Sequence, residues 1–286
     1  MSAYAFRLLN VFAESTFGGN PLCVFEDGRG LDDATMQSLA RQFNLSETTF
    51  LLPSERAVAC VRVFTPDYEM PFAGHPTLGS AHVVRDLHKT GDSFVLEFAA
   101  GVVPVSASAD RWTLTAPAGG QPKTAACDVS RATIASVFGL AADDLADEPT
   151  WVDTGVRQLL VPLASPDAVR RVRPDASRLK DWPSHGIARE SAYLFAFDPA
   201  RAGKIVSRYF FVMQGSSVVE DPGTGSACAN LGGWLRSRDA PLPLTYEIEQ
   251  GDAISRPCRL RLDVARDRAI RVGGRVVEIG RGTVTL

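Results

Sequence analysis

Apolar residues form two kinds of pattern along this chain, and the commoner pattern predicts strands. Short apolar runs bounded by turn-forming residues are typical of strands in a buried sheet. In the first half such runs span residues 4–11, 22–25, 48–52, 58–65, 94–98, 102–106 and 112–116. In the second half they span residues 158–163, 192–197, 205–212, 244–249, 259–264, 270–272 and 274–286. The chain is therefore expected to consist largely of strands.

Three segments show helical spacing instead. The first lies between Leu31 and Asn44, where Asp32 offers an N-terminal cap. The second opens at Gly74, and apolar residues cover much of its surface, which predicts a helix enclosed by strands. The third runs from about Gly225 to Arg236. A few helices among many strands predict an α+β fold.

The order of these elements repeats in the two halves of the chain. Three pairs of segments mark the repeat: Glu47–Leu52 with Glu190–Phe195, Arg62–Phe64 with Arg208–Phe210, and Gly74–Thr77 with Gly223–Ser226. The period is far longer than a solenoid unit, so we infer two homologous domains related by a pseudo-twofold, each with strands around one central helix. We expect them at 1–117 and 124–286, joined by a linker near 117–122, with the last strand able to pair back with the first domain. The alternative is a chance resemblance of short strings.

Composition narrows the class of protein. The 286 residues are 45% hydrophobic and 22% charged, which is ordinary for a globular protein and excludes disorder. A net charge of −3 argues against a nucleic-acid binder, and no apolar run approaches the roughly 18 residues of a membrane span. The N-terminus does not read as a signal peptide, so we expect a cytoplasmic protein. The five cysteines form no C-x-x-C pair, which disfavours a zinc site or a disulfide framework.

The starts of the two central helices favour anion binding. Gly74 opens the first helix, and Thr224, Gly225 and Ser226 open the second. A helix N-terminus presents unpaired N–H groups and partial positive charge, and glycine lets a ligand approach the backbone closely. If a pseudo-twofold relates the domains, both starts can face the cleft between them, which would hold a small carboxylate. The alternative for each is a well-capped, buried helix.

Candidate acid/base groups lie near the same features. Glu47 follows the first amphipathic helix, His75 lies in the first turn of the first central helix, and Asp221 precedes the second. A carboxylate buried in a closing cleft has its pKa raised toward neutrality, which suits proton transfer. The alternatives are a solvated turn residue for Glu47, a satisfied helix-terminal histidine for His75 and a cap for Asp221. Cys228 lies a turn into a buried helix and is expected to be a core residue.

Together these motifs resemble the PhzF family of phenazine-biosynthesis isomerases, within the diaminopimelate epimerase-like fold. The resemblance extends along nearly the whole chain. The matching segments are Phe17–Pro21, Asn44–Thr48, Arg62–Pro66, Pro71–Pro76, Val219–Ala227 and Gly280–Val284. The family implies two similar domains, each a β-barrel-like sheet around a helix, with the active site between them. It also implies a homodimer.

The resemblance also implies roles for residues. Glu47 matches the acid/base glutamate, and His75 and Asp221 match its polar partners. Thr224, Ser226 and the backbone of Gly74 and Gly225 would bind the substrate, a small carboxylate such as trans-2,3-dihydro-3-hydroxyanthranilate. No metal or organic cofactor is implied.

Two other activities stay open. Related epimerases carry a cysteine pair where this chain has Ala73 and Pro222, so a two-thiol racemase is disfavoured. A non-thiol epimerase of an amino-acid derivative remains an alternative, as does a small-acid-binding protein without turnover.

Overall fold

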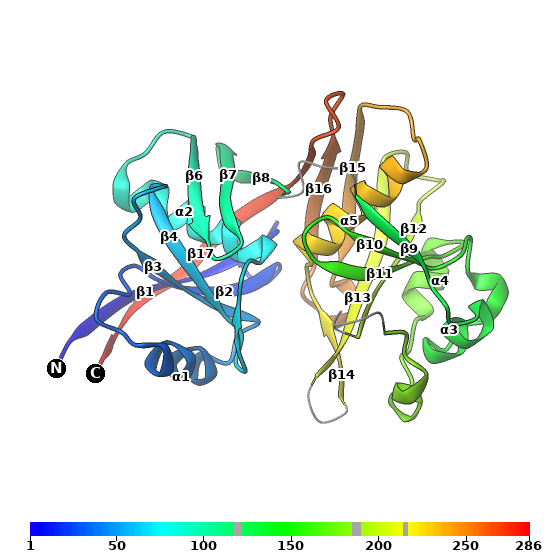
Figure 1. Cartoon of the computed structure of the whole chain (residues 1–286), viewed down its shortest axis with the longest axis horizontal. Helices are drawn as coiled ribbons and strands as arrows, with labels where there is room; N and C mark the ends of the chain where they lie inside the picture. Colours follow the sequence, from blue (N-terminus) through cyan, green and yellow to red (C-terminus); the bar gives the residue numbers. More distant parts are fainter. Residues whose placement is uncertain (117–121, 185–189, 214–216) are drawn as a thin grey trace. The chain divides into compact units, whose positions relative to one another are not determined.

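The computed structural model describes residues 1–116, 122–184, 190–213 and 217–286 (Figure 1). The expected linker over 117–122 lies outside the described residues, apart from Pro122. Contacts divide the chain into two compact units. The first comprises Met1–Pro117 together with Val272–Leu286, and the second comprises Ala118–Arg271.

Eight strands of the first unit close into a barrel. In ring order they are β1 (Ala3–Val11), β2 (Asn20–Phe25), β3 (Glu47–Leu52), β4 (Ala59–Phe64), β6 (Ser93–Phe98), β7 (Gly101–Ser108), β8 (Arg111–Thr115) and β17 (Ile270–Thr285). The ring closes where β17 pairs antiparallel with β1, the red and blue strands of Figure 1. The pairs β2–β3 and β4–β6 are parallel, and the short strand β5 (Glu69–Met70) extends from β4.

Helix α2 (Gly74–His88) packs against β1, β2, β3, β4 and β8. Its first two turns are almost wholly buried, which confirms the predicted enclosed helix. Gly79 lies so close to Leu22 of β2 that a Cβ would clash with that side chain. Helix α1 (Asp33–Phe43) packs on β3 and β4, and Asp32 caps it by accepting the Thr35 N–H at 2.8 Å.

The second unit also has paired strands that pack against one central helix. Its strands are β9 (Lys123–Ala126), β10 (Thr150–Asp153), β11 (Arg157–Pro162), β12 (Ser191–Phe197), β13 (Lys204–Met213), β14 (Ser217–Asp221), β15 (Leu244–Gln250) and β16 (Cys258–Val264). They pair in the order β9–β10–β11–β12–β13–β15–β16, with β14 as a hairpin partner of β13. Helix α5 (Gly225–Ser237) packs against β9, β10, β11 and β16.

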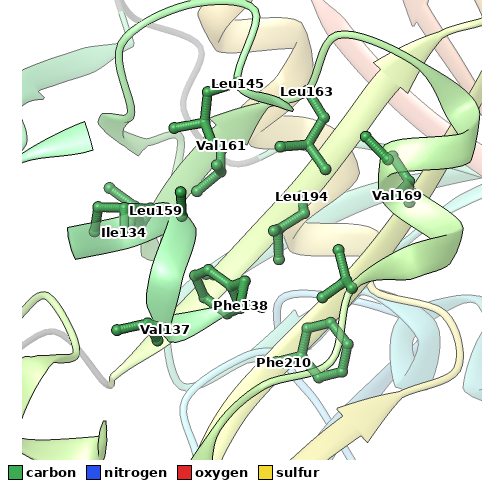
Figure 2. Packing of buried hydrophobic residues seen from close by; sticks show 14 of the residues in the cluster. Ile134, Val137, Phe138, Leu145, Leu159, Val161, Leu163, Val169, Leu194 and Phe210 are labelled. Carbon is green, nitrogen blue, oxygen red and sulfur yellow. The ribbon is translucent and has the colours of Figure 1, made fainter. Parts of the chain in front are cut away.

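A second helical layer covers this sheet. Helices α3 (Arg131–Val137) and α4 (Pro166–Arg171) bury apolar side chains against β11, β12 and β13 around Phe138 (Figure 2). Three short 3₁₀ turns, η1 (Ala142–Asp144), η2 (Ala176–Asp181) and η3 (Asp252–Ile254), complete the unit.

The repeat extends to individual side chains. In the first unit Arg62 holds Glu69 through two hydrogen bonds, from Nε at 2.7 Å and from Nη2 at 2.6 Å. In the second unit Arg208 holds Glu220 in the same two-pronged way, at 2.9 and 2.6 Å. Each arginine also lies over a phenylalanine two residues further along its strand. The same fork at equivalent positions of two ladders supports a duplicated unit.

These ion pairs fix the register of the repeat. The helices α2 and α5 both begin five residues after the paired glutamate, so Gly74 corresponds to Gly225 and His75 to Ser226. The sequence comparison had set Gly74 opposite Gly223, two residues too early. The pairing of the strands, rather than sequence similarity, decides which residues of the two units are equivalent.

One expected boundary is wrong. The segments 270–272 and 274–286 form a single strand, β17, although Gly273 and Gly274 suggested a break. A Cβ on Gly273 would lie 2.6 Å from the Trp112 carbonyl oxygen of β8. This glycine therefore marks a close approach of two backbones, a known use of glycine inside strands.

Candidate active site

Glu47 and His75 come together in the first unit. Glu47 is the first residue of β3 and His75 is the second residue of α2, which packs against that strand. His75 Nε2 lies 3.2 Å from Glu47 Oε2. The side chains are 6% and 16% exposed, so the pair is largely desolvated. Gly74, at the start of the same helix, is buried beside them.

The imidazole of His75 is held neutral. Burial lowers the pKa of His75 to about 3, although a hydrogen bond to the Pro21 backbone opposes this shift. Because proline has no N–H, the ring must donate this bond to the Pro21 carbonyl, which leaves the other ring nitrogen as an acceptor. Nε2 faces Glu47, so we assign the donated proton to Nδ1. The contact between Nε2 and Oε2 is then attractive when one proton lies between them.

Glycine at position 19 helps to place the Pro21 carbonyl. Gly19 has φ +80°, and a Cβ there would lie 2.7 Å from the Val11 carbonyl oxygen. A side chain at this position would therefore be both strained and crowded. The Gly18–Pro21 turn therefore packs closely against the end of β1 and leads directly into β2.

In the second unit Asp221 ends β14 and lies in a compact polar turn before α5. Its carboxylate accepts a short hydrogen bond from the Thr224 hydroxyl. Gln250 donates to the Asp221 carbonyl at 2.9 Å and to Thr224 Oγ1 at 3.0 Å, and accepts the Thr224 N–H at 3.3 Å. Gly251 has φ +81°, and a Cβ there would lie 2.5 Å from the Pro222 carbonyl oxygen. The end of β15 therefore fixes the Asp221 turn.

Ser226, in the first turn of α5, belongs to a second polar cluster. Its Oγ accepts a hydrogen bond from Gln158 Nε2 at 3.0 Å. The same nitrogen donates to Tyr209 Oη at 3.1 Å, and Gln158 Oε1 accepts from Asn230 Nδ2 at 2.8 Å. Gln158 and Asn230 are 3% and 0% exposed, so these bonds form away from water.

Gln158, Asn230 and Gln250 were not among the residues expected from the sequence. The sequence did contain a signal for two of them, because each is a polar residue within an element that is otherwise apolar. Gln158 lies within an apolar strand and Asn230 within an apolar helix. Their partners lie far along the chain, so spacing alone does not connect them.

Two cysteines of the second unit, Cys228 and Cys258, are buried thiols. Cys228 is fully buried inside α5, and burial raises the pKa of its thiol far above the usual range. The pKa of Cys258 is raised too, by burial first and then by the Asp221 charge. The expectation that Cys228 is a core residue is confirmed. Across the described ranges, no cluster of three or more His, Cys, Asp or Glu side chains is arranged to hold a metal ion.

The expected site residues therefore form two groups. Glu47, Gly74 and His75 lie together in the first unit. Asp221, Thr224, Gly225 and Ser226 lie together at the start of α5 in the second unit. That both groups serve one substrate stays a prediction.

Comparison with known proteins identifies the family. The family model described as phenazine biosynthesis-like protein, PhzC-PhzF, matches residues 9–282. The chain belongs to the PhzC-PhzF family. An uncharacterised isomerase of Pasteurella multocida is 40% identical to this PhzF-family chain over 284 residues, covering 99% of the chain and 94% of the relative.

A relative with a named reaction is also similar. The trans-2,3-dihydro-3-hydroxyanthranilate isomerase of Pseudomonas aeruginosa is 33% identical over 290 residues, covering 99% of this chain and all of the relative. The PhzF-family chain is accordingly an isomerase.

A solved structure agrees with the fold. A predicted epimerase from Pseudomonas aeruginosa superposes with a TM-score of 0.79 at 28% identity, covering 99% of both chains. The PhzF-family chain thus has the expected α+β, diaminopimelate epimerase-like fold. In the parts that the structure describes, no helix has the length and apolar character needed to cross a membrane.

Proposed function

We propose that this isomerase moves a proton between two carbons of a small cyclic carboxylate, and that Glu47 carries the proton. The substrate that we propose is trans-2,3-dihydro-3-hydroxyanthranilate or a close relative. A proton leaves C3 and a proton returns at another ring carbon, so no atom is gained or lost. The resulting enol then becomes a ketone. The observation that carries the proposal is the desolvated Glu47–His75 contact at 3.2 Å.

The geometry supports this role for Glu47 because the pair can store one proton. With Nδ1–H directed at Pro21, His75 Nε2 is left as an acceptor 3.2 Å from Glu47 Oε2, so a neutral Glu47 carboxyl can turn its proton toward the ring. As an anion Glu47 can take the substrate proton, and as a neutral acid it can return one. A positioned general acid or base contributes about 10²–10⁴-fold to a rate. The low exposure of both side chains keeps water from competing for the proton.

The second group of residues has a binding role in the proposal. The first N–H groups of α5 and the Ser226 hydroxyl can donate to a carboxylate, and Thr224 and Asp221 hold the turn that precedes them. A homodimer and a cytoplasmic location stay predictions.

The test is solvent-proton exchange. Purified protein is incubated with trans-2,3-dihydro-3-hydroxyanthranilate in D₂O, and deuterium incorporation and product formation are followed by NMR and mass spectrometry. Glu47→Gln should lower the turnover rate by at least about 10²-fold because the amide cannot accept the substrate proton. The matched control is Glu55→Gln, which changes an exposed glutamate of the same unit. Wild-type rates in Glu47→Gln would show that another group moves the proton.

A further inference from the structure

The hydrogen bonds behind Ser226 have a fixed direction that starts at the backbone. Asn230 Oδ1 accepts the Thr154 backbone N–H at 2.9 Å, and Asn230 Nδ2 donates to the Val156 carbonyl at 2.8 Å. A backbone N–H can only donate and a carbonyl can only accept, so the Asn230 amide has one possible orientation. The Thr154 hydroxyl adds a second donor to Oδ1 at 2.7 Å.

The orientation of the Asn230 amide determines the orientation of the Gln158 amide. The remaining hydrogen on Asn230 Nδ2 points at Gln158, so the Gln158 atom that faces it at 2.8 Å must be the acceptor Oε1. Gln158 Nε2 therefore faces the other way, with one hydrogen to Tyr209 Oη and one to Ser226 Oγ. Both hydrogens of this amide are used.

The proton of Ser226 is therefore available to a ligand. Its Oγ is an acceptor toward Gln158, so the hydroxyl hydrogen must point elsewhere. Among the described residues, the Gln158 amide is the hydrogen-bond partner of Ser226 Oγ. Ser226 is half-buried in the first turn of α5, where the helix dipole favours an anion.

We propose that Asn230 and Gln158 are positioning residues that direct the Ser226 hydroxyl proton toward the substrate carboxylate. This inference rests on the proposed function for the identity of the substrate. The backbone between β10 and β11 fixes the orientation of the Asn230 amide, and the Asn230 amide fixes the orientation of the Gln158 amide. The Gln158 amide in turn makes Ser226 Oγ an acceptor, so that the hydroxyl proton points away from Gln158. The site is thus built to present a donor rather than an acceptor, and it selects an anionic group at this position.

The hydrogen bonds from Asn230 through Gln158 to Ser226 form a relay, and the duplicated unit shows that the fold does not require it. The strand ladders set Leu22 of β2 at the position of Gln158, and the helix starts set Gly79 at the position of Asn230. Leu22 and Gly79 also contact each other, as Gln158 and Asn230 do, but the contact is apolar. The same place in the same architecture is therefore packed without polar groups. The polar pair occurs only in the unit where it faces Ser226.

Two variants of Gln158 separate positioning from packing. Gln158→Glu still accepts the bond from Asn230, but as an anion it also accepts from Ser226 and turns the hydroxyl proton away from the ligand. Gln158→Leu places in β11 the residue that occupies the equivalent site of β2, and it leaves the Ser226 hydroxyl free to rotate toward the ligand. If Gln158 only supports packing, the leucine variant, which loses every hydrogen bond, should be the worse of the two.

The expected result is a split between KM and kcat for trans-2,3-dihydro-3-hydroxyanthranilate. Ser226→Ala and Gln158→Glu should each raise KM by about 10- to 100-fold, the range for losing a hydrogen bond to a charged group, with kcat little changed. Gln158→Leu should raise KM by no more than about five-fold. In the Ser226→Ala background, Gln158→Glu should have no further effect. A further rise there would indicate simple charge repulsion and would overturn the inference, as would a leucine variant weaker than the glutamate variant.

A measurement without substrate keeps failure of the relay distinct from failure of the proposed function. In protein labelled with ¹⁵N-glutamine, the Gln158 side-chain amide is assigned by its loss in Gln158→Leu. Its hydrogens should exchange slowly with solvent and should exchange at least about ten-fold faster in Asn230→Ala. Rapid exchange in the wild type would overturn the relay. Slow exchange in a protein that does not turn over the substrate would overturn only the proposed function.

Discussion

Breaking the buried ion pair Arg208–Glu220 should cost far more stability than breaking its counterpart Arg62–Glu69. The two pairs have the same forked geometry but differ in burial. The Arg208 and Glu220 side chains are 9% and 7% exposed, whereas Arg62 and Glu69 are 23% and 36% exposed. Removing one partner of a buried pair leaves an uncompensated charge, which costs about 3–5 kcal/mol. A solvated pair contributes only about 0–1 kcal/mol.

The surroundings of each arginine place the two variants within these ranges. In Glu220→Gln, Arg208 keeps its hydrogen bond to the Val172 carbonyl oxygen at 2.7 Å. That carbonyl group carries no charge, so it does not neutralise the guanidinium. The new amide can still accept one bond, so we expect the lower limit, about 3 kcal/mol. In Glu69→Gln, Arg62 keeps a full ion pair with Asp33 at 2.7 Å, so we expect at most about 1 kcal/mol.

Urea unfolding monitored by tryptophan fluorescence measures both losses. Trp112 belongs to the first unit, and Trp151, Trp182 and Trp234 belong to the second, so each variant lies in a unit with its own reporter. Equal losses for the two variants, within about 0.5 kcal/mol, would refute burial as the cause of the difference. Replacing both partners with apolar residues, as in Arg208→Met with Glu220→Leu, should recover part of the loss because no lone charge remains buried.

Two further predictions concern residues around the candidate site. In the folded protein the pKa of His75 is about 3, below its usual 6.5. Between pH 3 and pH 6.5 the unfolded chain therefore binds a proton on His75 that the native state does not bind. The unfolding free energy should therefore fall by about 1.4 kcal/mol per pH unit as pH drops from 6.5 toward 3, and this component should be missing from urea titrations of His75→Gln; an unchanged slope would contradict the assignment. Gly251→Ala should destabilise the protein more than Gly203→Ala. Both glycines have φ near +80°, but a Cβ at 251 meets Pro222 at 2.5 Å while one at 203 has no atom nearer than 4.0 Å, so equal melting temperatures would rule out crowding as the cause.

Local patterns predicted the elements that dominate the core. The apolar surface of α2 and the small residues at the start of α5 were readable from the sequence because each depends on neighbours within one or two turns. Glu47 and His75 were both named, but their contact depends on how α2 packs against β3. Elements as short as β9, with four residues, and α4, with six, were missed because such lengths give no clear periodicity.

The relay behind Ser226 was beyond sequence reasoning for a different reason. Asn230 lies 72 residues from Gln158 and 76 residues from Thr154. A buried asparagine in isolation is compatible with many partners, and only the packing of α5 against β10 and β11 selects them. The register of the repeat was missed for a related reason, since Gly223 and Gly225 offer the same letter at two positions and only the paired strands distinguish them.

The pairing of β1 with β17 has a consequence for synthesis on the ribosome. Strand β1 finds one of its two neighbours only after β17 has emerged, and β17 is synthesised after nearly all of the second unit, residues 118–271. A nascent chain would therefore hold an open, unpaired β1 edge while the later-made unit is already able to fold, reversing the usual N-terminal-first order. Until β17 emerges, that exposed edge can bind a chaperone or pair wrongly with a neighbouring polypeptide.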